Sequence, residues 1–205
     1  MSQKSIDKDN QILDAAAKHF AINGFGGARV DEIAAEAGVN KATLYYRIGD
    51  KAALYNRIFS DMLDKVLNKI TEKVNSAESC EQKLRAYCHA IANECSQNEY
   101  ISAFILREVA SGGAQMSENS LHKMRQVRLI LNDILQQGAE KGEFRHTNPF
   151  MVYITMVGTL NFFAAAYPTS QNSQTSQEST EIETVSLFDV AEEISNMVLN
   201  SIKMH

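Results

Sequence analysis

The chain has 205 residues, of which 44% are hydrophobic, and its formal net charge is −5. This composition excludes a disordered, collagen-like or disulfide-rich chain, and the length suits one elongated helical body or one domain with a small second domain. The overall acidity argues against indiscriminate coating of nucleic acid. Residues 1–60 nevertheless hold 8 Lys/Arg against 7 Asp/Glu, so this part of the chain can carry a local basic surface.

The first quarter of the sequence shows apolar residues at helical spacing, interrupted by glycine. A helix is predicted within 9–25, stopped by an Asn-Gly pair. A second is predicted over 30–37 and ends at Gly38, which can take the left-handed conformation. Asn40 is a good N-cap for a third, very short helix. Residue 50 then caps a long helix that continues to about residue 75.

The remaining sequence is helical as well, with only two prolines in the whole chain. Helices are predicted near 79–97, 99–111, 118–140, 148–167 and 184–203. The segment 168–180 has no large apolar residue and is expected to be a mobile loop. No strand pattern appears, so the predicted fold is all-α with about nine helices. The expected domains are 1–55, a helix-turn-helix domain, and 56–205, a helical ligand-binding and dimerisation domain.

Three cysteines, Cys80, Cys88 and Cys95, lie on one predicted helix. Their spacing is not the close spacing of structural zinc ligands, so no metal is expected. The odd number, without a signal peptide, indicates free thiols in a reducing cytoplasm. Redox sensing by Cys88 and Cys95 is disfavoured, because two helical turns separate them.

An uncharged stretch over 150–167 resembles a membrane span in length. It contains Thr155 and Asn161 and has no basic cluster beside it. A helix that is apolar all round is also typical of one buried between subunits. We therefore expect a subunit contact and no membrane partner.

The short third helix explains how the first domain can bind DNA. Three short helices with a tight turn between the last two form a helix-turn-helix. Leu44 and Ile48 share one face that packs on the first two helices, while Tyr45 and Tyr46 lie elsewhere on the surface. Tyrosine hydroxyls can donate to phosphates while the rings cover sugars and thymine methyl groups. The expected DNA-binding residues are Arg29, Asn40, Lys41, Ala42, Thr43, Tyr45, Tyr46, Arg47 and Lys51. An ordinary three-helix bundle with tyrosines as rim packing is the alternative.

Residues 11–58 resemble the N-terminal domain of the TetR (tetracycline-repressor-like) transcriptional regulators, especially in "IAAEAGV" and "ATLYYRIGDKAAL". The resemblance implies a homodimer that represses transcription until a small molecule binds a helical C-terminal domain. It also implies that 40–47 is the recognition helix. Ala28 departs from the threonine common in the family, which puts one phosphate contact and the cap of the second helix in doubt.

The C-terminal body is predicted to contain an effector pocket and a dimer interface. A pocket is mostly apolar with a few polar groups, and the candidates are Tyr87, Cys88, Tyr100, Phe104, Met124, Tyr153, Met156, Asn161 and Phe162. Two helices from each subunit are expected to form a four-helix interface, with candidates Met151, Gly158, Ala165, Leu187, Val190, Ile194 and Met197. Arg107 and Glu108 are expected to form a surface pair.

Catalytic motifs are missing: the sequence has no Gly-rich phosphate loop, no H-E-x-x-H and no G-x-S-x-G. We therefore expect no enzyme and no cofactor. The function predicted is a homodimeric, ligand-responsive repressor released from a palindromic operator by a small, apolar molecule. A regulator without a small-molecule ligand, an activator and a helical scaffold that does not bind DNA are the alternatives.

Overall fold

The computed structural model describes residues 3–97, 100–172 and 185–204. Across these residues the chain is all-α, which confirms the predicted class: nine helices are present when α8, η1 and α9 are counted as one continuous helix. Outside the helices, one isolated bridge joins Phe144 to Lys203. The elements are α1 (Gln3–Gly27), α2 (Val30–Glu36), α3 (Lys41–Ile48), α4 (Lys51–Asn75), α5 (Cys80–Gln97), α6 (Ile101–Ala110), α7 (Glu118–Glu140), α8 (Pro149–Tyr153), η1 (Ile154–Gly158), α9 (Thr159–Asn172) and α10 (Leu187–Ile202).

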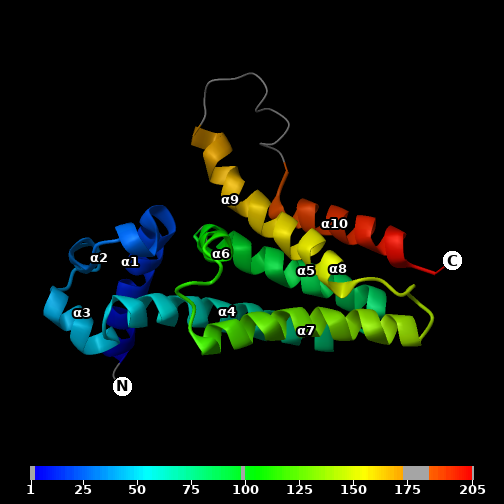
Figure 1. Cartoon of the computed structure of the whole chain (residues 1–205), viewed down its shortest axis with the longest axis horizontal. Helices are drawn as coiled ribbons and strands as arrows, with labels where there is room; N and C mark the ends of the chain where they lie inside the picture. The colour runs from blue at the N-terminus through cyan, green and yellow to red at the C-terminus, as the bar shows by residue number, and fades with distance from the viewer. Residues whose placement is uncertain (1–2, 98–99, 173–184, 205) are drawn as a thin grey trace.

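Helices α1, α2 and α3 form a head at one end of the molecule, and α4 runs from this head into the body (Figure 1). Glycine sets the head's turns: Gly24 interrupts α1 with a φ of 67°, and Gly38 follows α2 with a φ of 61°. The Asp50 side chain accepts a hydrogen bond from the Ala53 amide at 2.7 Å and caps α4. The expected domain boundary at residue 55 falls inside α4, so one continuous helix connects head and body.

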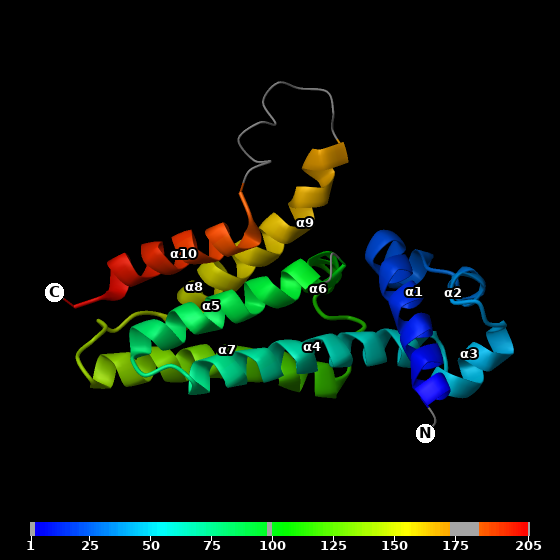
Figure 2. The ribbon, with the colours of Figure 1, turned by 180° about the vertical axis from the view of Figure 1, so that it is seen from behind.

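The body is built around α5. Helix α4 packs against α5 and α7, and α10 packs against α5 on the other side, as the view from behind also shows (Figure 2). Helix α1 contacts both α4 and α6, which places α6 between the head and the body. One continuous apolar core runs through head and body, so the two parts are mechanically connected by packed side chains.

The helix predicted over 148–167 is longer than expected and contains a π-helical turn, η1. Residues 168–172, expected in a loop, are helical, and residues 173–180 of that predicted loop lie outside the described residues. The window Pro149–Ala166 is long and apolar enough to cross a membrane by length and composition, and 33% of it is buried. Much of its apolar surface therefore faces outward in the single chain.

Candidate functional site

Helix α3 is held from behind and exposed in front. The Asn40 side chain accepts a hydrogen bond from the Thr43 amide at 2.7 Å, which caps the helix as predicted. Leu44 is fully buried, and Ile48 packs partly buried against the same core. Tyr46, in contrast, is 91% exposed. A large aromatic side chain held in solvent on a short, capped helix is suited to contact a partner.

The cations of the head make contacts within the head itself. Lys41 forms an ion pair with Asp31 at 3.0 Å, and this hydrogen-bonded pair raises the pKa of the lysine. Lys51 donates to the Gly26 carbonyl at 3.4 Å, and its ammonium lies 4.9 Å from the centroid of the Phe25 ring. Both lysine contacts are weak enough for a phosphate to compete with them.

Arg47 lies differently from the other expected DNA ligands. Its guanidinium forms a 2.7 Å ion pair with Asp9 of α1, and both side chains are about three-quarters buried. This pair fastens α3 to α1, so Arg47 braces α3. Its use as a DNA ligand would require breaking that contact.

The remaining expected contacts lie on the outside of the head. Arg29 and Ala42 are exposed, Thr43 is half-buried and Tyr45 is exposed beside Tyr46. Arg29 is also the N-cap residue of α2 and makes no capping hydrogen bond with its side chain. The cap position expected at Ala28 thus falls one residue later, and Ala28 is buried.

A buried polar pair joins α4 to α6 directly behind the head. The Tyr55 hydroxyl donates to Oε1 of Glu108 at 2.5 Å, and Glu108 is only 3% exposed. Burial, and then the carboxylate, raise the pKa of Tyr55. Arg107 donates to the Ile22 carbonyl at 2.9 Å, so the surface pair expected for Arg107 and Glu108 is wrong. Sequence spacing could not reveal this, because Tyr55 is distant from Glu108 along the chain.

An apolar cavity lies inside the body, between α4, α5, α6, α7 and the α8–η1–α9 helix. Its volume is about 40 Å³, room for a few water-sized groups. Three of the predicted pocket residues line it: Met124, Tyr153 and Asn161. The other lining residues, which were not predicted from the sequence as pocket residues, are Leu63, Val66, Ile91, Cys95, Ile101, Ile105, Val127 and Val157.

The other predicted pocket residues lie outside this cavity. Tyr87 and Cys88 are fully buried in the core, where the tyrosine donates to the Val127 carbonyl at 3.1 Å. Phe104 is buried against the Tyr55 ring, with 4.6 Å between centroids.

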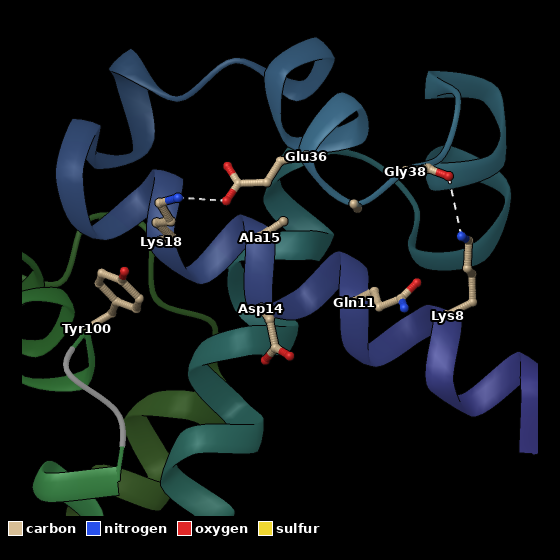
Figure 3. A pocket seen from close by; sticks show the side chains of 9 residues that line it. Lys8, Gln11, Asp14, Ala15, Lys18, Glu36, Gly38 and Tyr100 are labelled. Carbon is tan, nitrogen blue, oxygen red and sulfur yellow. Dashed lines mark hydrogen bonds and ion pairs between the residues drawn. The ribbon is translucent and has the colours of Figure 1, made fainter.

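Three further candidates are dispersed. Met156 is buried in the core, and Phe162 is 69% exposed. Tyr100 borders an open groove beside α1, where Lys18 pairs with Glu36 at 2.7 Å (Figure 3). This groove is formed mainly by the head, so Tyr100 does not belong to the internal cavity.

An apolar face extends over α8, η1, α9 and α10. Two of the expected interface residues are strongly exposed, Met151 at 59% and Met197 at 66%. Four of the others, Gly158, Ala165, Leu187 and Val190, are half-buried, and Ile194 is buried. Further large apolar residues of these helices are exposed, although they were not predicted from the sequence to lie in the interface: Phe150, Ile154, Phe162, which was a pocket candidate, and Phe188.

Among the described residues no group of His, Cys, Asp or Glu is arranged to hold a metal ion. Cys80, Cys88 and Cys95 are free and buried. Burial raises the pKa of the Cys88 thiol to about 11 and also raises that of Cys95. These thiols are therefore protonated and unreactive near neutral pH.

Comparison with known proteins connects the head and the body to one family. Residues 12–58 match "Bacterial regulatory proteins, tetR family", and residues 77–167 match "Tetracyclin repressor-like, C-terminal domain". An uncharacterized HTH-type transcriptional regulator of Bacillus subtilis, YhgD, is 25% identical over 75% of this chain and 80% of its own length. The HTH-type transcriptional repressor KstR2 of Mycolicibacterium smegmatis is 26% identical over 70% of each chain.

The fold has a solved counterpart. The structure of the transcriptional regulator FadR from Bacillus subtilis in complex with stearoyl-CoA superposes with a TM-score of 0.71 at 17% identity, covering 96% of this chain and 99% of that chain. At this identity the likeness concerns the fold alone. The family matches, together with an exposed α3 on a three-helix head, show that this chain belongs to the TetR family of transcriptional regulators.

Proposed function

We propose that the chain acts in the cytoplasm as a homodimeric repressor that binds a palindromic operator and leaves it when a small apolar molecule binds the body. The observation that carries the DNA-binding part is the contrast across α3. Leu44 is fully buried on one side, and Tyr46 is 91% exposed on the other. A short helix presented in this way fits the major groove with its N-terminal residues at the base edges.

The dimer is supported by the apolar face of α8, η1, α9 and α10. Exposed side chains such as Phe162 and Met197 would remain in contact with water in a single chain. A second copy of the same face would cover them in a four-helix contact with twofold symmetry. Such a dimer would place two α3 helices on one face of DNA, about 34–36 Å apart.

The effector's apolar character is supported by the cavity lining. Seven of the eleven lining residues are Leu, Val or Ile, and none is charged. A solved structure with the same fold also supports a ligand with a long apolar part, because the FadR structure is a complex with stearoyl-CoA. Because the cavity measures only about 40 Å³, any larger ligand has to displace α4 or the α8–η1–α9 helix. That displacement would change the position of the heads.

DNA binding can be tested on a double-stranded pool of random sequence, with the bound fraction selected and its affinity measured by fluorescence anisotropy. Tyr46→Ala should weaken binding to the selected site about tenfold or more, the effect of losing a base or phosphate contact of about 1–3 kcal/mol. Lys41→Ala should reduce the slope of log affinity against log salt by about one.

The matched control is Leu129→Ala, which removes an exposed apolar side chain from α7, outside the proposed dimer face. At saturating dimer concentration it should leave the intrinsic affinity for the selected DNA unchanged. If Tyr46→Ala bound as tightly as the unmodified chain, or if no sequence were enriched from the pool, a scaffold role would replace the repressor. A sedimentation experiment that shows a monomer at micromolar concentration would contradict the proposed dimer.

A further inference from the structure

We infer that Asn161 selects the effector, and that this effector carries a neutral hydrogen-bond donor, such as a hydroxyl group, on an otherwise apolar body. The inference rests on the ligand response proposed above and makes it chemically specific. The supporting observation is one polar group in the cavity wall. The Asn161 side-chain amide is buried there, and its oxygen has no hydrogen-bond partner among the described residues.

The orientation of the Asn161 amide is fixed by its own helix. Its Nδ2 donates to the Val157 carbonyl at 2.8 Å. The flipped amide would bring two acceptors, Oδ1 and the Val157 carbonyl, into contact, so the observed orientation is the one that hydrogen bonding requires. The Asn161 Oδ1 atom is therefore the acceptor that remains without a hydrogen bond. Asn161 is 3% exposed, so bulk water cannot satisfy it.

Leaving a buried acceptor unpaired is unfavourable, and leucine would pack in a similar volume without that cost. The cavity beside it has room for a few water-sized groups. A ligand hydroxyl donating to Oδ1 would satisfy the acceptor in this space. The position therefore has the properties of a recognition group, because the acceptor becomes favourable only when a donor enters.

The adjacent π-helical turn supports this assignment. Tyr153 precedes η1, Val157 lies within it and Asn161 lies one turn beyond it, and all three line the cavity. Single π-turns inside α-helices occur frequently at functional sites. The Asn161 amide also donates to a carbonyl of this irregular turn, so a ligand at Oδ1 would act directly beside the π-helical part of the wall.

The other polar groups of the cavity argue for a neutral ligand. Tyr153 and Cys95 are the remaining lining residues with a hydroxyl or thiol, and burial raises the pKa of both. No lining residue carries a formal charge that could neutralise an ionised ligand group. Any charged portion of an effector would have to lie outside this cavity.

A hydrogen-bonding site discriminates between ligands more strongly than an apolar wall does. An apolar pocket cannot strongly reject a ligand that merely adds or lacks a hydroxyl, whereas a buried polar partner penalises the analogue that leaves it unpaired. The relevant quantity is a ratio of affinities for two ligands of equal shape. That ratio cancels differences in size and reveals the contribution of Asn161.

Phenol and toluene are suitable probes, because they differ by replacement of a hydroxyl with a methyl group. Both are larger than the cavity of about 40 Å³, so both require the same displacement of its wall, and that shared cost cancels in the ratio of their affinities. Their dissociation constants would be measured by calorimetry on the full chain and on Asn161→Leu. The preference for phenol over toluene should fall at least about tenfold in the variant, the factor expected for one buried hydrogen bond. Ile91→Val, which trims the same wall without touching a polar group, should leave this preference within about twofold.

If Asn161→Leu fails to fold, Asn161→Val gives the same comparison. On the unmodified chain, the side-chain amide resonances of Asn161 should shift with phenol and much less with toluene. An unchanged preference in the variants, or no binding of either probe, would overturn the inference. Binding of the selected DNA is measured in the same samples. A chain that binds DNA but shows no phenol preference loses only this inference, whereas a chain that never binds DNA loses the proposed function.

Discussion

The buried Tyr55–Glu108 pair at the junction of head and body predicts a measurable stability effect. Tyr55→Phe keeps the ring, which packs 4.9 Å from the Phe20 centroid, and removes only the hydroxyl that donates to Glu108 at 2.5 Å. The second carboxyl oxygen of Glu108 is already without a partner among the described residues. The substitution would therefore leave the whole carboxyl group buried and unpaired.

A hydrogen bond to a charged or partly charged group contributes about 1.5–3 kcal/mol. We therefore expect Tyr55→Phe to lower the free energy of unfolding by about 2 kcal/mol. For a chain of this length that corresponds to a fall in Tm of about 4–8 °C. Urea unfolding followed by far-UV circular dichroism, together with a calorimetric Tm, measures both quantities.

Two further variants separate the hydrogen bond from packing. Glu108→Met alone should destabilise, because it leaves the Tyr55 hydroxyl buried without its acceptor. The double variant should recover most of the loss, since replacing both partners of a buried polar pair by apolar groups is often nearly neutral. If Tyr55→Phe proves neutral, or if the two single effects simply add, the pair does not stabilise the junction and the reasoning is refuted.

Three shorter predictions concern a close contact, a helix cap and alkaline pH. A Cβ on Gly138 would lie 2.1 Å from Phe144 Cδ2, so Gly138→Ala should destabilise by about 1–3 kcal/mol in urea unfolding. Gly26→Ala, whose Cβ would meet no atom within 4 Å, is the tolerated control. Asn40→Ala should cost about 1 kcal/mol and weaken DNA binding, because it removes the cap of α3. Burial raises the pKa of Cys88 to about 11, so the unfolded chain releases this proton first. The contribution of this thiol to the free energy of unfolding is fully present below about pH 9 and is lost as pH rises through 11. About 1 kcal/mol of it is lost by pH 10. Urea unfolding at pH 8 and at pH 10 measures this loss.

The head could be predicted well because its signals are local. Asn40 and Asp50 each cap a helix through the amide three residues later, and Gly38 adopts the expected left-handed conformation. The partners of Arg47 could not be predicted in the same way. Asp9 lies on another helix, and helical periodicity indicates which face is buried without identifying the partner on the other side.

The internal cavity shows a different limit of sequence reasoning. Periodicity identifies apolar side chains, but it does not distinguish a cavity wall from solid core, and Tyr87 and Met156 proved to be core. The outward position of Phe162 follows from its place on the helix. Tyr153, Val157 and Asn161 line the cavity at intervals of four residues, and Phe162 comes directly after Asn161, so its side chain is turned by about 100° from that of Asn161 and faces outward.

Helix α4 is the element through which the cavity can act on the DNA-binding head. Leu63 and Val66 line the cavity, Tyr55 lies about 12 Å earlier along the same helix axis, and Lys51 begins the helix at the head. Under the proposed function, a ligand that enlarges the cavity would displace Leu63 and Val66, and the continuous helix would transmit this displacement as a tilt about the point where Tyr55 is bonded to Glu108. Ligand and DNA would then weaken each other by the same factor, typically about 1–3 kcal/mol.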